Sequence, residues 1–377
     1  MQLELADARR LADAERALGE TPAGCTWLDD RTIDDLELGR AFAAIDRTRT
    51  PIGAQVLWRM LAAPADDPAV LAARERKLAQ LADRELRARV VGALGAGAAA
   101  DAPHLPRLLW AAPPIAPRGR TIALLGGALV LCVLLARWWP PLLLGAVIVI
   151  GASLLFDDWS KLGTSQHARA LELLGCALGR AAALVKIVPD AAIARDVAAV
   201  RGRLRRRLAI LAARDPFELL EVLRAALLVR VTVVRSAIGI VTGERARLRR
   251  IVVWLGEVDA LAAIAALRVA RTDARVPALR QLATPEIDAR DLVDPSIAEA
   301  VGNDLVLDRG LLVTGSNMSG KSTLLRAIGL AAIFAQSIHT TFGSWRASFM
   351  RVRAVMRVAD DPARALSTFA VEVAAIG

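Results

Sequence analysis

A chain of 377 residues, 55% of them hydrophobic, is long enough for two or three domains with sizeable cores. The three cysteines are scattered, which excludes a disulfide framework and a closely spaced cysteine metal site. With no tyrosine and only seven phenylalanines, an aromatic platform for single-stranded nucleic acid is not expected. The net charge of +10 fits nucleic acid or anionic lipid as a partner, and it fits a high-GC codon bias equally well.

The N-terminal part of the chain predicts amphipathic helices. Residues 1–20 place leucine and alanine at helical spacing between charges, which indicates a surface helix and not a signal peptide. A helical pattern covers residues 26–59, with a turn before Pro51. An Asp-Asp-Pro sequence then caps a helix predicted over about residues 69–91. Residues 92–120 are rich in alanine, glycine and proline, a composition typical of a linker.

Two uncharged apolar runs, residues 121–136 and 142–156, flank a turn that contains two tryptophans. A membrane-spanning helix needs about 20 apolar residues, and neither run shows the polar stripe of a soluble hairpin. The sequence therefore predicts a transmembrane helical hairpin over residues 116–160, with residues 121–156 in contact with the membrane. A buried hairpin of a large core is the alternative. Arg118 and Arg120 predict an inner (cytoplasmic) membrane location with both soluble parts facing the cytoplasm.

Helical patterns continue over residues 167–187, 215–240 and 243–267. A basic cluster falls between the first two of these helices, on a further predicted helix. Such a cluster contacts phosphates of DNA or lipid, or it is a solvated face paired with nearby acids, and the sequence leaves both readings open. The arginines of this cluster are Arg201, Arg203, Arg205, Arg206 and Arg207.

The most specific motif lies in residues 311–329. Residues 311–314 predict a buried strand, followed by Gly-Ser-Asn-Met-Ser-Gly-Lys-Ser and a helix to about residue 337. The spacing G-x-x-x-x-G-K-[ST] between a strand and a helix is that of a phosphate-binding loop. Its glycines let backbone N–H groups and the helix N-terminus face a polyphosphate. Lys321 is expected to reach the β- and γ-phosphates and Ser322 to hold Mg²⁺, so ATP and Mg are the predicted cofactors.

The inner loop residues Ser-Asn-Met-Ser resemble the MutS family of DNA mismatch-repair ATPases. Other segments look like the family's signature region and the start of its helical core. These are residues 357–361 (Arg-Val-Ala-Asp-Asp) and 366–372 (Leu-Ser-Thr-Phe-Ala-Val-Glu) for the signature, and residues 35–38 (Asp-Leu-Glu-Leu) and 50–54 (Thr-Pro-Ile-Gly-Ala) for the core. The resemblance covers about residues 25–83 and 250–377.

The resemblance implies an α+β multidomain protein with a mostly α-helical MutS-like core. The expected parts are the N-terminal helical core (1–115), the inserted transmembrane hairpin (116–160), the remaining helical core or lever (161–275) and an incomplete α/β P-loop ATPase domain (276–377). Because MutS proteins of the mismatch-repair type have no such hairpin, we expect a membrane-attached branch of the family.

In related ATPases each nucleotide lies between the phosphate loop of one subunit and the signature loop of another. The resemblance therefore implies a homodimer, with the Ser367 hydroxyl on the γ-phosphate and Thr368 as the neighbouring candidate. It also implies DNA as a partner, and Asn317 and Lys321 as catalytic candidates. The predicted nucleotide-binding residues are Gly315, Ser316, Asn317, Met318, Ser319, Gly320, Lys321, Ser322, Thr323 and Ser367.

The family's Asp-Glu pair, which holds the Mg²⁺ shell and polarises water, follows the signature region, and no such pair occurs before Gly377. We therefore expect an ATPase domain truncated before this pair, with weak ATP binding and poor hydrolysis. Whether the chain is an ATPase is left open. The alternatives are a membrane-associated, ATP-switched scaffold that does not bind DNA, an inactive fragment of such an ATPase, or a transport ATPase.

Overall fold

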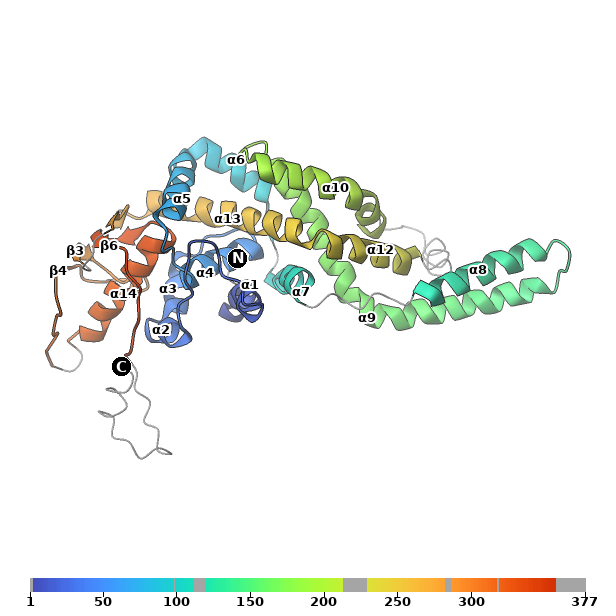
Figure 1. Cartoon of the computed structure of the whole chain (residues 1–377), viewed down its shortest axis with the longest axis horizontal. Coiled ribbons are helices and arrows are strands. Elements are labelled where there is room, and N and C mark those ends of the chain that lie inside the picture. The colour runs from blue at the N-terminus through green and yellow to red at the C-terminus, as the bar shows by residue number, and fades with distance from the viewer. Residues whose placement is uncertain are drawn as a thin grey trace, which may run out of the picture. The chain divides into compact units, whose positions relative to one another are not determined.

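The computed structural model describes residues 3–97, 99–111, 119–212, 229–281, 286–316 and 319–356 (Figure 1). The chain forms two compact units. The first consists of Met1–Ala99 and Gly256–Gly377, and the second of Ala100–Leu255. One boundary therefore falls inside the long helix α13 (Arg245–Ala270). The four-part division expected from the sequence stays a prediction.

The N-terminal part of the first unit is helical, and side chains cap several helix starts. Asp29, Thr50, Asp67 and Asp83 each accept a hydrogen bond from a backbone N–H in the first turn of the helix that follows. The sequence predicted one helix over about residues 69–91, but the chain forms two helices there, and Asp83 caps the start of the second. The helices are α1 (Leu5–Ala17), α2 (Asp30–Asp35), α3 (Leu38–Ile45), α4 (Pro51–Ala62), α5 (Pro68–Leu81) and α6 (Arg84–Leu94).

Helices α4 and α13 approach each other closely because glycines face the contact. A Cβ atom on Gly256 would lie 2.7 Å from the carbonyl oxygen of Ile52, and one on Gly53 would lie 2.2 Å from Oδ2 of Asp259. Neither distance is available to a real Cβ atom, so each position requires glycine at this separation of the helices.

The remainder of the first unit contains two small sheets and one covering helix. Strands β1 (Ala274–Arg275) and β5 (Thr341–Phe342) form an antiparallel pair. The second sheet has the order β2-β6-β3-β4, in which only the β2–β6 pair is parallel. Its strands are β2 (Ala278–Arg280), β3 (Ile287–Leu292), β4 (Asn303–Leu307) and β6 (Ser344–Ser348).

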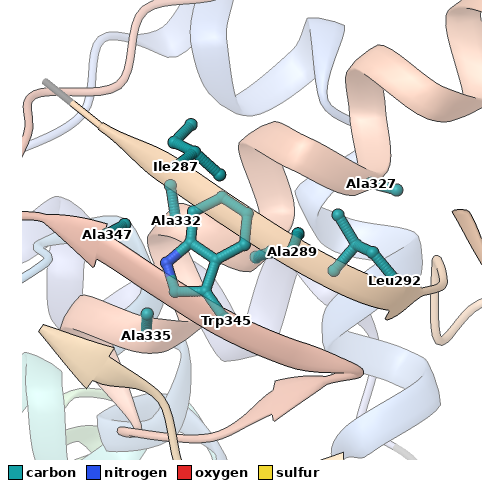
Figure 2. Close-up of a cluster of buried hydrophobic side chains, with 9 residues drawn as sticks. Ile287, Ala289, Leu292, Ala327, Ala332, Ala335, Trp345 and Ala347 are labelled. Carbon is teal, nitrogen blue, oxygen red and sulfur yellow. The ribbon is translucent and has the colours of Figure 1, made fainter. Parts of the chain in front are cut away.

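Helix α14 (Lys321–Ser337) covers one face of the four-stranded sheet. Its contact face consists of alanines, among them Ala327 and Ala335, which let the helix lie close to the strands (Figure 2). The indole of Trp345 fills the space between β3 and the helix and is 1% exposed. This small core fixes the position of α14, the helix that follows the phosphate loop.

The second unit is built around the long helix α9 (Leu142–Leu184), which contains most of the helix predicted over residues 167–187. Among the helices that the structure describes, four pack closely against α9. They are α7 (His104–Trp110), α8 (Gly119–Leu135), α10 (Ala191–Ala212) and α12 (Val229–Gly243). The N-terminal part of α13 completes the unit. A single 3₁₀ turn, η1 (Ala99–Asp101), precedes α7.

The transmembrane hairpin predicted over residues 116–160 is wrong. Among the residues that the structure describes, no helix combines the length and the apolar character needed to cross a membrane. Helix α8 has 17 residues, about 25 Å of helix, against a hydrocarbon core about 30 Å thick. In α9 the uncharged run stops at Asp157 and Asp158, and the helix continues into a charged, amphipathic segment.

The two apolar runs form the paired helices α8 and α9, which lie side by side in Figure 1. The membrane contact through residues 121–156 and the cytoplasmic-membrane location were inferred from this hairpin, and both are withdrawn with it. The corrected fold class is α+β, with a mostly helical chain and two small sheets.

Candidate nucleotide-binding site

The phosphate loop joins residue 314 to the N-terminus of α14, as the motif predicts. Gly320 occupies the N-cap position with φ +87°, a left-handed conformation that side chains other than glycine rarely adopt. A Cβ atom on Gly315 would lie 2.9 Å from Oγ of Ser319, so a larger residue there would displace the Ser319 hydroxyl. Asn317 and Met318 lie outside the described residues.

The side chain of Lys321 folds back across the loop. Its Nζ donates hydrogen bonds to the carbonyl oxygens of Gly315 and Ser316, at 2.8 and 2.5 Å, and lies 3.4 Å from Oγ of Ser319. The described residues of the loop therefore place two carbonyl oxygens and one hydroxyl around a positive charge. The first turn of α14, in which Ser322 is exposed and Thr323 half-buried, begins directly after the loop, and its first N–H groups have no acceptor within the helix.

Two predicted strands around the loop differ from the structure. Residues 311–314 are not a strand, and Leu311 and Leu312 are 54% and 86% exposed. The sequence also predicts a strand over residues 349–358, but β6 ends at Ser348 and residues 349–356 form no strand. A strand needs a neighbour to pair with, and none of the described strands lies beside residues 311–314.

The structure thus brings Gly315, Ser316, Ser319 and Lys321 together in one loop, next to Ser322 and Thr323. The signature residues Ser367 and Thr368 lie outside the described residues. The nucleotide and Mg²⁺ roles of all these residues stay predictions.

Helix α2 and the turn after it hold α14 and the chain that precedes the predicted signature region, contacts that sequence reasoning missed. Glu37 accepts a hydrogen bond from Arg326 of α14 at 2.9 Å. Thr32 and Asp35 accept hydrogen bonds from the backbone N–H groups of Ala354 and Met356, at 3.1 and 2.9 Å. The Asp-Leu-Glu-Leu pattern drew attention to this turn as part of the resemblance, but it assigned the residues no role.

The C-terminal end of α14 is anchored as well. The side chain of Gln336 donates to the carbonyl oxygens of Ala65 and Met350 and accepts from the N–H of Met350. The buried guanidinium of Arg74 donates to the carbonyl oxygen of Ser337 at 2.6 Å. Both ends of the helix that follows the phosphate loop are therefore tied to the N-terminal helices of the first unit.

Part of the basic cluster has polar partners within the second unit. Arg203 forms an ion pair with Glu244 at 2.5 Å, and Arg207 donates to the Ser236 hydroxyl at 2.7 Å. Arg201 is exposed, and the side chains of Arg205 and Arg206 lie outside the described residues. These contacts favour the solvated, paired face for Arg203 and Arg207.

Comparisons with known proteins agree with this geometry. The model of the family described as MutS domain V matches residues 311–377, which include the phosphate loop and α14. The DNA mismatch repair protein MutS of Chloroflexus aurantiacus is 36% identical over 145 residues, which cover 34% of this chain and 14% of the relative. The proteins of the same name from Haloquadratum walsbyi and Thermosipho melanesiensis are 31% and 37% identical over 99 and 90 residues.

These partial matches support membership of the MutS family. The matches to the Haloquadratum and Thermosipho MutS proteins cover 26% and 22% of the chain and 11% of each relative. The chain therefore matches only a small part of these MutS proteins. The part of MutS domain V that the structure describes contains the loop around Lys321, α14, β5 and β6.

Proposed function

We propose that this MutS-family chain binds ATP with Mg²⁺ at residues 315–323, and that binding joins two copies of the chain. The observation that carries the proposal is the loop that closes around the Lys321 ammonium at the N-terminus of a 17-residue helix. A backbone cradle with a cation at its centre and a helix N-terminus beside it is suited to a polyphosphate.

The residues present fit MgATP, which would supply a polyanion and a transferable γ-phosphoryl group. Lys321 exchanges its carbonyl partners for phosphate oxygens and holds the phosphates by charge. The N–H groups at the start of α14 orient the same anion, and the Ser322 hydroxyl is the ligand that this chain offers to Mg²⁺. Gly315 and Gly320 keep the backbone close enough for these contacts.

Association of two copies is the second part of the proposal. A γ-phosphate held by Lys321 in one copy and by Ser367 in the other would couple nucleotide binding to dimer formation. The relatives are named DNA mismatch repair proteins, which supports DNA as the partner of the assembled protein.

Nucleotide binding is tested by titrating the 377-residue chain with a fluorescent ATP analogue, with and without Mg²⁺. Lys321→Ala is expected to weaken binding at least about tenfold, because it removes the charge at the centre of the loop. Lys186→Ala, which removes an exposed lysine of the second unit, is the matched control. Equal affinities for the wild type and Lys321→Ala would overturn the proposal.

A second candidate is an ATP-switched scaffold that does not bind DNA. It is favoured by the pairing of Arg203 with Glu244 and of Arg250 with Asp196, which occupies arginines that would otherwise face phosphates. Duplex DNA binding measured across salt concentrations separates the two candidates. A steep loss of affinity with salt indicates phosphate contacts, and a slope near zero favours the scaffold.

A further inference from the structure

The hairpin of α8 and α9 carries large apolar side chains on its outer surface. We call these residues the hairpin patch. They lie in α8, in the turn that follows it and in the first turns of α9, and each is between 42% and 85% exposed. The patch consists of Leu124, Leu131, Leu134, Leu135, Trp138, Trp139, Leu144, Val147 and Ile148.

The contact between the two helices uses few residues. Helix α8 lies beside the first part of α9 (Figure 1), and among the described helices α9 is the one that packs closely against α8. Within the described side chains of residues 124–152, the buried apolar residues are Leu129 and Ala146, at most 8% exposed. A Cβ atom on Gly145 would lie 3.4 Å from Sγ of Cys132, so the two helices approach each other here over small side chains. The large side chains of the patch are therefore left outside this contact.

The patch follows the helical repeat. On α8, Leu131 lies seven residues after Leu124 and Leu135 four residues after Leu131, so the three form a stripe along one side of the helix. On α9, Ile148 lies four residues after Leu144, which is the same spacing. A helix that is apolar on all sides is normally buried, so these exposed sides call for a partner.

The exposed area of the patch is close to one side of a stable protein interface. Burying an aliphatic side chain removes about 60–120 Å² of apolar surface from water, and burying an aromatic one removes about 150–250 Å². Weighted by their exposed fractions, the patch residues together present about 700 Å². A standard interface buries about 800 Å² per partner, whereas the largest apolar patch of a monomeric protein is about 300–600 Å².

The lack of charge on the hairpin points to a second copy as the partner. Residues 121–136 and 142–156 contain no charged side chain. In a twofold dimer the same surface meets itself, so it must be complementary to itself. An uncharged apolar surface meets this condition because no opposite charges have to be matched, whereas charge complementarity is what selects a different partner.

We propose that two copies of this chain associate through the hairpin patch, so that two α8–α9 hairpins form a four-helix contact. This association needs no nucleotide. It is independent of the proposed joining of two copies at residues 315–323, because the patch and the phosphate loop belong to different units of the chain.

Sedimentation equilibrium of the 377-residue chain without nucleotide tests the proposal. The wild type is expected to be a dimer at about 10 μM. The double variant Leu131→Gln/Trp138→Ser should raise the Kd of the dimer at least about hundredfold, because each copy loses two apolar contacts. Leu18→Gln is the matched control, since it also removes an exposed leucine but lies in the first unit. Both Leu18→Gln and Lys321→Ala should associate like the wild type.

Amide hydrogen exchange locates the contact. Exchange at residues 124–148 should slow when the wild-type concentration is raised, and exchange in α1 should stay the same. Circular dichroism establishes that each variant keeps the helix content of the wild type.

A wild type that stays monomeric at this concentration overturns the proposal, as do assemblies that keep growing beyond the dimer. Association that survives in Leu131→Gln/Trp138→Ser also overturns it, because another surface would then join the copies. A monomeric chain that floats with phosphatidylcholine vesicles would assign the patch to lipid in place of a second copy. A chain that binds no ATP analogue but still dimerises through the hairpin overturns the proposed function alone.

Discussion

Oδ2 of Asp259 accepts a hydrogen bond from the Thr50 hydroxyl at 2.6 Å, although the two residues are 209 positions apart in the sequence. The same carboxylate accepts the N–H groups of Thr50 and Arg49, at 2.8 and 3.0 Å. Thr50 in turn caps α4 by accepting the N–H of Gly53. Asp259, which is 1% exposed, therefore fixes the start of α4 from within α13.

Removing this carboxylate should destabilise the first unit. Asp259→Ala leaves the buried N–H and hydroxyl of Thr50 without their acceptor and removes the acceptor of the Arg49 N–H, and we expect the free energy of unfolding to fall by about 2–4 kcal/mol. Urea unfolding followed by circular dichroism measures the change. Asp34→Ala serves as the control, since Asp34 is exposed and pairs with Arg9 at 3.5 Å, and its effect should stay within about 0.5 kcal/mol.

Substitution by alanine should have opposite effects on stability at two glycines, one at the contact of α4 and α13 and one outside it. Gly256→Ala places a methyl group against the carbonyl oxygen of Ile52 and should lower stability by about 1–3 kcal/mol. Gly239→Ala, in α12, has nothing within 4 Å of the added methyl group and should raise stability by about 0.5–1 kcal/mol. Thermal unfolding of both variants checks the signs, and a gain at Gly256 would contradict the observed helix separation.

An ion cluster near the end of α14 predicts how stability depends on pH. Burial pushes the pKa of Glu75 upward, but hydrogen bonds from Arg268 and His339 outweigh burial and hold the pKa below its ordinary value of 4.5. Because the folded state lowers this pKa, the stabilisation is present above pH 4.5 and is lost as the pH falls through the folded-state value.

The variant Glu75→Gln removes this titration. Its thermal midpoint should therefore fall less steeply than that of the wild type as the pH drops below 4.5, while it is lower than the wild type near neutral pH. Scanning the melting temperature of both proteins from about pH 3 to about pH 7 gives the comparison. If the melting temperatures of the two proteins fell in parallel with pH, Glu75 would not contribute to the loss of stability at low pH.

Local signals made much of the helical part predictable. Pro51 after Thr50 marks the start of α4, and the apolar period over residues 243–267 marks α13 (Arg245–Ala270). The same reasoning failed at residues 121–156, because apolar composition alone does not distinguish helices that pack on each other from helices that cross a membrane. The charges that follow in α9 belong to the same continuous helix.

The position of a glycine-containing loop directly before α14 was predictable for the same reason as the caps, since the glycine and lysine spacing is local, and its phosphate-binding role stays a prediction. The contacts that other parts of the chain make around this loop and α14 could not be predicted. The contacts of Glu37 with Arg326, and of Asp35 with Met356, join residues 289 and 321 positions apart, which no periodicity reports. Residues 311–314 read as a strand from their apolar side chains, but a strand is defined by partners elsewhere in the chain.

Gly320 gives the most direct test of the loop geometry. With φ +87° and nothing within 4 Å of an added Cβ atom, Gly320→Ala changes only the backbone preference at the N-cap of α14. We expect the described residues of the loop to relax away from the conformation that holds Lys321, at a cost of about 1 kcal/mol, and the Kd for an ATP analogue to rise by about fivefold. Gly310→Ala is the matched control, because it also has open space but no positive φ. Equal nucleotide affinities for the two variants would show that the left-handed residue at the start of α14 is not needed to hold the phosphates.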